Sequence, residues 1–138
     1  MGQPVVHFEI TGRDLSRLRS FYSELFGWEI DTSYVPHYGT VERNTNAEGI
    51  GIAGAVSEVP ERPSTTYRGP TRSQGYQGHV TVYVEVPNVE AALAHAETLG
   101  GTRTLGPDDI GGGTVIGLLN DPEGHLIGLV KTPQGERS

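Results

Sequence analysis

The sequence predicts an α+β fold built from two βαβββ modules, each forming a curved mixed sheet with a helix on one face and a concave ligand-binding face on the other. Two observations predict it: an alternating strand followed by an amphipathic helix occurs twice, and the helix boundaries repeat at one offset. The caps Asp14 and Asn88 lie 74 residues apart, as do the stops Gly27 and Gly101. We expect one domain, with module one at about 4–57, a connector at about 58–77 and module two at about 78–132.

Module one begins with a strand at 5–10, whose alternation puts Phe8 and Ile10 on one face and His7 and Glu9 on the other. Apolar residues then recur at helical spacing from Leu15 until the left-handed stop at glycine 27. Short strand-like runs follow at 28–30, 40–43 and 49–56. These strands complete the first predicted sheet.

Module two repeats this order. Its first strand, 79–86, has four valines on one face and His79, Thr81, Tyr83 and Glu85 on the other. A helix follows the cap Asn88, and further strands are expected at 102–105, 114–119 and 126–130. The segment between the modules, 57–78, is rich in proline, glycine and hydroxyl residues, which is typical of a mobile linker or a lid.

Composition excludes several classes of function. Ten basic and seventeen acidic residues give a net charge of −7, which would repel a phosphate backbone, so nucleic acid is not expected as a partner. The absence of cysteine excludes disulfides and thiolate metal sites. No secretion signal and no apolar run of about 18 residues is present, so we expect a cytoplasmic protein that does not enter a membrane.

Several motifs carry a family resemblance: the strand at 6–10, Phe21-Tyr22, the Leu25-Phe26-Gly27-Trp28 run and the Asn120-to-His125 turn. They resemble the vicinal oxygen chelate superfamily, which includes glyoxalases, bleomycin-resistance proteins and extradiol dioxygenases. The resemblance covers nearly the whole chain except the connector. It implies the fold but no single activity, because the superfamily contains lyases, isomerases, dioxygenases and antibiotic-sequestering proteins.

The resemblance also implies four metal-ligand positions, one on the first and one on the last strand of each module. His7, seven residues before the cap, matches the first position, whereas the same count from Asn88 reaches Thr81. His79 lies two residues, about 6.5 Å, from that position, so it could replace the ligand only through a bulge or a shifted register. The closing-strand position of module two is Gly128, and the run 52–55 of module one contains no acid. We therefore expect no metal and no other cofactor, with His7 and His79 the only donors if an atypical site exists.

Two groups of residues are candidates for chemistry or binding. His7 and Glu9 share one strand face and could act as an acid–base pair, or could only hydrogen-bond neighbours or a ligand. Aromatic residues outside the helices could line a pocket for a flat ligand, or could simply pack or lie in surface loops: Trp28, Tyr34, Tyr38, Tyr67, Tyr76 and Tyr83. The predicted ligand-binding set is His7, Glu9, Trp28, His79, Thr81, Tyr83, Glu85 and Gly128.

These observations favour a metal-free protein that binds or sequesters an apolar or aromatic metabolite or antibiotic, and that resembles family members which form homodimers. The alternative is an enzyme of the lyase, isomerase or dioxygenase kind. Such an enzyme would use His7 and Glu9 with an atypical divalent metal, or metal-free acid–base catalysis by Glu9.

Overall fold

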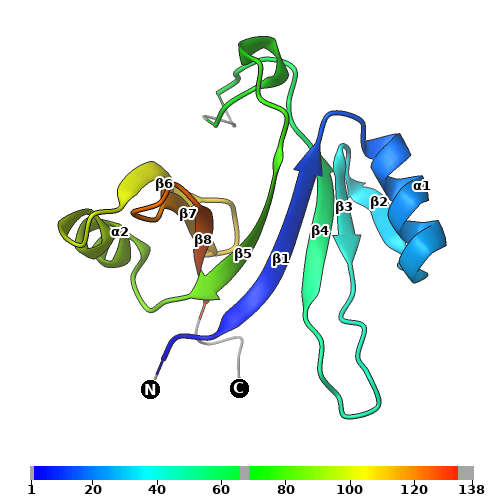
Figure 1. The fold of residues 1–138 in the computed structure, drawn as a ribbon, viewed down its shortest axis with the longest axis horizontal. Helices are drawn as coiled ribbons and strands as arrows, with labels where there is room; N and C mark the ends of the chain where they lie inside the picture. Colours follow the sequence, from blue (N-terminus) through cyan, green and yellow to red (C-terminus); the bar gives the residue numbers. More distant parts are fainter. Residues whose placement is uncertain (1, 66–68, 134–138) are drawn as a thin grey trace. The chain divides into compact units, whose positions relative to one another are not determined.

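The computed structural model describes residues 2–65 and 69–133. Its described part divides into two compact units (Figure 1). The first unit is His7–Val80. The second unit begins at Thr81 and includes the residues before His7. The predicted connector at about 58–77 thus lies within the first unit, and so do the first two residues of strand β5.

The first unit contains a four-stranded sheet in the order β2-β3-β4-β1. Its β1–β4 pair is parallel, and the β2–β3 and β3–β4 pairs are antiparallel. The elements are β1 Val5–Gly12, α1 Leu15–Phe26, β2 Ile30–Val35, β3 Tyr38–Val41, β4 Ala53–Glu58 and the 3₁₀ helix η1 Arg72–Gln74.

The second unit repeats this arrangement in the order β5-β8-β7-β6, again with one parallel pair followed by two antiparallel pairs. Its elements are β5 His79–Glu85, α2 Val89–Thr98, β6 Thr102–Asp109, β7 Val115–Asn120 and β8 Leu126–Lys131. The matching strand order confirms the predicted α+β fold and its two βαβββ modules.

Both helices begin where the sequence predicts. The Asp14 side chain accepts a hydrogen bond from the backbone N–H of Arg17, and Asn88 accepts one from Ala91. Helix α1 ends at Gly27 with φ 73°, a left-handed conformation that glycine adopts without steric cost. Helix α2 ends at Thr98 with Leu99 as its C-cap, and the left-handed glycine that follows is Gly100, with φ 97°, so the predicted stop at Gly101 was wrong by one residue.

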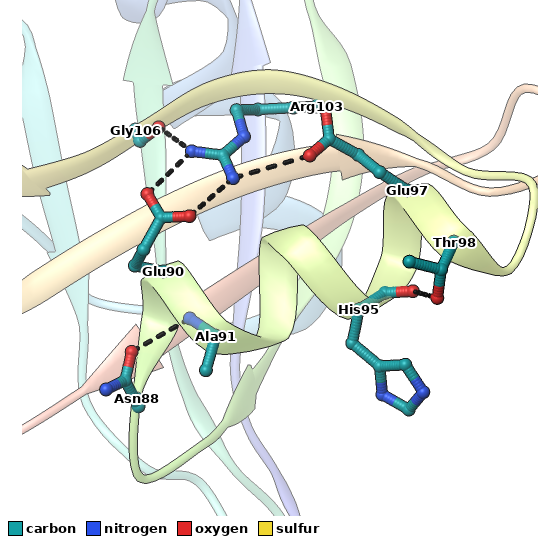
Figure 2. A network of polar contacts seen from close by, with 8 residues as sticks. All are labelled: Asn88, Glu90, Ala91, His95, Glu97, Thr98, Arg103 and Gly106. Carbon is teal, nitrogen blue, oxygen red and sulfur yellow. Dashed lines mark hydrogen bonds and ion pairs between the residues drawn. The ribbon is translucent and has the colours of Figure 1, made fainter.

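Each helix packs on one face of its sheet and closes a small core. In the first unit the buried residues are Leu15 from α1 and one residue from each of β2, β3 and β4, namely Ile30, Val41 and Val56. In the second unit Val89 and Leu93 of α2 pack with Val86 and Leu129. On its outer side α2 is linked to β6 by Arg103, whose guanidinium binds Glu90 at 2.6 and 2.8 Å and Glu97 at 3.5 Å (Figure 2).

Three strand predictions were wrong in position. β2 begins at Ile30 and continues through a polar run to Val35, with an irregular register against β3, so hydrophobic alternation does not reveal it. β4 begins at Ala53, because Asn46 and two positive-φ glycines, Gly49 and Gly51, form a loop before it. β6 extends past the predicted end to Asp109.

Among the described residues, no helix is both long enough and apolar enough to cross a membrane.

Candidate ligand-binding site

Strand β1 separates the core of the first unit from a polar face. Phe8 and Ile10 pack against the α1 core, as the alternation predicts. His7 and Glu9 therefore point to the opposite side of the strand. Their partners on β4 are Ala53 and Ala55, which carry only methyl groups. The polar groups nearest to Glu9 accordingly come from other segments of the unit.

A chain of hydrogen bonds ends on Glu9. The Nε2 atom of His79 lies 2.8 Å from Glu9 Oε1, and the two side chains are 14% and 13% exposed. On the other side of the imidazole, Nδ1 lies 2.5 Å from the hydroxyl of Tyr76. Three groups able to exchange or donate protons, Tyr76, His79 and Glu9, thus lie in one half-buried row.

Charge and burial change the proton affinities around this row. Burial, reinforced by the Glu9 carboxylate, raises the pKa of Tyr38 to about 12. The same two causes raise the pKa of Tyr76. Burial lowers the pKa of His7, although the Glu9 charge opposes this shift. Tyr38 and Tyr76 therefore keep their phenolic protons at neutral pH, and His7 is favoured in its neutral form.

The backbone before β5 brings His79 to Glu9. Gly78 has φ 107°, and a Cβ atom at this position would lie 2.1 Å from the carbonyl oxygen of Thr11. Only glycine permits this close approach. The next N–H, that of His79, donates to Thr11 Oγ1 at 3.1 Å. These two contacts pin the chain beside the end of β1 and direct the imidazole at the carboxylate.

The described part of the connector is packed against the first unit. Val59 N–H donates to the carbonyl of Gly12, and the Thr71 side chain is fully buried. Thr71 also forms a capping box with Gln74 at the start of η1. Arg72 pairs with Glu58 of β4 at 3.3 Å, and the same carboxylate accepts the N–H of Leu15 at 3.0 Å. These contacts fix the position of the segment that leads to Tyr76.

Apart from His79, the predicted site residues of module two have contacts within the second unit. Thr81 is buried and donates its hydroxyl proton to the carbonyl of Leu126 at 2.6 Å. The ring of Tyr83 covers Gly128, where a Cβ atom would lie 2.5 Å from the ring. Glu85 accepts a hydrogen bond from Thr132 Oγ1 at 3.1 Å.

Trp28 lies with the helix. Its ring stacks on Tyr22 at 5.6 Å and contacts Phe8 and Phe26 at 5.2 and 5.1 Å, so it belongs to the α1 side of β1. This is the packing alternative that the sequence left open, and it corrects the assignment of Trp28 to the ligand-binding face. Tyr34 is 79% exposed. Tyr67, also among the predicted aromatics, lies outside the described residues.

The comparison with protein families decides the classification. Residues 5–129 match the model of the Glyoxalase/Bleomycin resistance protein/Dioxygenase superfamily. The chain belongs to this superfamily.

Two relatives are similar to this chain in sequence. The proteins named "Putative glyoxylase CFP32" from Mycobacterium bovis and Mycobacterium tuberculosis are each 28% identical over 109 residues, which is 79% of this chain but only 38% of theirs. The chain thus spans less than half the length of these relatives.

Solved structures are similar over nearly the whole chain. A methylmalonyl-CoA epimerase in complex with methylmalonyl-CoA has a TM-score of 0.64 at 20% identity, covering 96% of both chains. A variant of the Streptomyces coelicolor methylmalonyl-CoA epimerase, in complex with 2-nitronate-propionyl-CoA, has a TM-score of 0.63 at 21% identity, covering 94% of this chain and 97% of that one. At these identities the likeness establishes the fold alone.

The metal-ligand positions that the resemblance implies lie on the first and last strands of the two modules, which are β1, β4, β5 and β8. On β8 this position is Gly128, which the ring of Tyr83 covers, and on β4 the residues paired with His7 and Glu9 are Ala53 and Ala55. A carboxylate at Gly128 would require the ring of Tyr83 to move. Both ring nitrogens of His79 already have partners. Within the part of the chain that the structure describes, no group of three His, Asp or Glu side chains is arranged to hold a metal ion.

The sequence predicted Glu9 and His7 as a pair and placed His79 on a separate strand face with Thr81, Tyr83 and Glu85. The structure joins Glu9 to His79 instead, and adds Tyr76 and Tyr38 as polar groups rather than as stacking surfaces. The signal that could have indicated this is Gly78 directly before a strand, because a glycine there allows the strand start to approach another backbone.

Proposed function

We propose that this superfamily member is a small-molecule-binding protein that holds a polar group of its ligand at Glu9, His79 and Tyr76, without a resident metal. The observation that carries the proposal is the half-buried Tyr76–His79–Glu9 row, on the strand face that α1 does not cover. Side chains with defined hydrogen-bond geometry in a partly desolvated environment orient a ligand more strongly than exposed groups do.

As finer parts of this proposal, the ligand is an apolar or aromatic metabolite or an antibiotic that is sequestered, and the protein is a cytoplasmic homodimer. Tyr38 and Tyr76 support the aromatic character of the ligand, because tyrosine combines a flat apolar ring with a hydroxyl donor. Light scattering after size-exclusion chromatography measures the dimer, and a monomer at micromolar concentration would contradict it.

The test is a thermal-shift screen of aromatic metabolites and antibiotics, followed by titration calorimetry of the compounds that stabilise the protein. A true ligand at a hundredfold excess over Kd stabilises the fold by about 2.7 kcal/mol. Glu9→Gln should weaken binding tenfold or more, because it removes the carboxylate and keeps the shape. Glu24→Gln, at an exposed position on α1, is the matched control and should bind as the wild type does.

Equal affinity in the Glu9→Gln variant would contradict the placement of the site. Elemental analysis of purified protein tests the metal-free part: a stoichiometric transition metal that survives dialysis would overturn it.

A second candidate function is metal-free proton transfer, and the same row favours it, since a carboxylate oriented by an imidazole is an arrangement suited to a general base. The fold's likeness to methylmalonyl-CoA epimerases suggests a substrate with which to begin. Methylmalonyl-CoA incubated with the protein in deuterium oxide should then lose the NMR signal of its exchangeable C–H. Glu9→Gln should abolish this exchange while the thioester still binds. Binding without exchange in the wild type would leave sequestration as the function.

A further inference from the structure

Both ring nitrogens of His79 are engaged, and the chemistry of the two partners determines where the imidazole proton lies. A carboxylate only accepts hydrogen bonds, so the Nε2 atom facing Glu9 Oε1 at 2.8 Å must carry the proton. In a neutral imidazole the Nδ1 atom is then an acceptor. With the ring in this state, the Tyr76 hydroxyl, 2.5 Å away, donates its proton to Nδ1.

We propose that Tyr76 is a positioning residue for His79: by donating to Nδ1, it fixes the imidazole in the Nε2–H tautomer and directs that N–H at the Glu9 carboxylate. The direction of donation is Tyr76 to His79 to Glu9. The inference rests on the proposed function only in taking Glu9 as the group that meets the ligand; the tautomer itself follows from the three side chains.

The local structure gives Tyr76 little freedom. Its backbone N–H donates to the carbonyl of Thr71, the buried residue that caps η1. The left-handed Gly75 before it and the close approach of Gly78 to Thr11 after it fix the turn on both sides. Tyr76 and His79 are only three residues apart in this segment. The same backbone contacts therefore fix the positions of both side chains.

The surrounding charges favour the same arrangement. Burial and the Glu9 charge raise the pKa of Tyr76, so its hydroxyl keeps the proton that it donates. Tyr38, whose pKa the same two causes raise, stays neutral beside the row. Burial lowers the pKa of His7, the other imidazole of this face, so it is favoured in its neutral form.

The consequence is a division of roles. Since the Nε2–H is committed to Glu9, His79 orients the carboxylate, and Glu9 acts on the ligand. We therefore expect a graded loss of ligand affinity. Glu9→Gln should have the largest effect, and Tyr76→Phe should weaken binding about threefold to tenfold, as expected for one lost hydrogen bond between neutral groups.

The test uses ¹⁵N NMR of the histidine side chains in the full chain, which needs no ligand. The loss of one signal set in His79→Gln assigns that residue among the five histidines. At neutral pH the wild type should show a protonated Nε2 and an unprotonated, hydrogen-bonded Nδ1. In Tyr76→Phe the Nδ1 signal should move to the shift of a nitrogen without a donor, whereas Tyr34→Phe, at an exposed tyrosine, should leave it unchanged.

A protonated Nδ1 in the wild type, whether in the Nδ1–H tautomer or in a doubly protonated ring, would overturn the inference. So would a Tyr76→Phe variant whose Nδ1 shift matches that of the wild type. The wild-type measurement decides the matter even if the variant does not fold. If the tautomer is as expected but no compound binds, the proposed function fails while the positioning of His79 by Tyr76 stands.

Discussion

The first strands of the two modules have the same place in the same fold, but their polar faces differ. On β1, Glu9 lies at the end of a row of proton-carrying groups, two of which come from outside the strand. At the equivalent position of β5, Tyr83 covers a glycine, and Thr81 donates to a main-chain carbonyl. The face of β1 that carries Glu9 brings together groups that can exchange protons. On β5, Thr81 and Tyr83 instead bond to the backbone and pack against it.

The difference shows that duplicating a scaffold does not duplicate a site. Strand order, helix caps and core positions repeat because each module must cover one sheet face with a helix to bury its apolar residues. Nothing in that requirement constrains the other face. On that face, the side chains of each module contact different neighbours. A single glycine or tyrosine therefore changes which polar groups come together there.

The largest effect on stability should come from Gly78→Ala, which disturbs the backbone that brings His79 to Glu9. The new Cβ would lie 2.1 Å from a backbone oxygen at φ 107°, so the backbone must move. We expect a loss of about 3 kcal/mol or more in the free energy of unfolding, measured with urea. Gly75→Ala, at φ 88° but with no atom within 4 Å, is the matched control and should cost only about 1 to 2 kcal/mol. Equal losses would show that close approach is not what Gly78 provides.

A second effect should appear at alkaline pH. The pKa of Tyr38 is raised from 10.0 in the unfolded chain to about 12 in the folded protein. Between these values the unfolded state has lost a proton that the native state retains, so stability is complete below pH 10 and falls as pH rises to about 12. The loss is about 2.7 kcal/mol.

Tyr38→Phe should remove this part of the pH dependence, whereas Tyr34→Phe should not. Urea unfolding across the alkaline range measures it. Glu9→Gln should lower the pKa of Tyr38, but only part of the way, since burial is the larger cause. The ionisation of Tyr38 is followed by phenol absorbance. If its pKa is the same in Glu9→Gln as in the wild type, the Glu9 charge does not act on Tyr38.

A smaller effect is expected from Gly128→Ala on the packing face of module two. The added Cβ would lie 2.5 Å from the Tyr83 ring, which can shift because it is a side chain. We expect a destabilisation of about 1 to 2 kcal/mol in urea unfolding. In a double-mutant cycle, Tyr83→Leu should relieve this loss, so that the two changes are not additive. Strict additivity would mean that the ring does not fill the space at Gly128.

The smallest effect should come from Glu90→Gln, which breaks the ion pair with Arg103 on the outer side of α2 (Figure 2). Both groups are at the surface, where solvent and salt screen their attraction. We expect a change in the urea midpoint close to the experimental error, and none at high salt. Glu48→Gln, in the exposed loop before β4, is the control. A clear destabilisation would show that this pair contributes to the attachment of α2.

The sequence by itself determined the architecture. The repeated caps Asp14 and Asn88, the stop at Gly27 and the alternation of β1 depend on local geometry, so they can be recognised without knowing distant neighbours. The same alternation correctly predicted that Glu9 and His7 face away from the helix. Edge strand β2 was predicted at 28–30 instead of Ile30–Val35, since its polar residues show no hydrophobic alternation.

Tertiary structure alone decided which groups meet Glu9. Alternation grouped His79 with Thr81, Tyr83 and Glu85, because these four residues occupy the odd positions of the strand and so share one face. In the folded chain, the positive φ of Gly78 and the hydrogen bond from His79 to Thr11 attach the start of β5 to the first unit. Contacts between residues 70 positions apart, such as His79 and Glu9, depend on how distant segments pack and are not encoded in any local spacing.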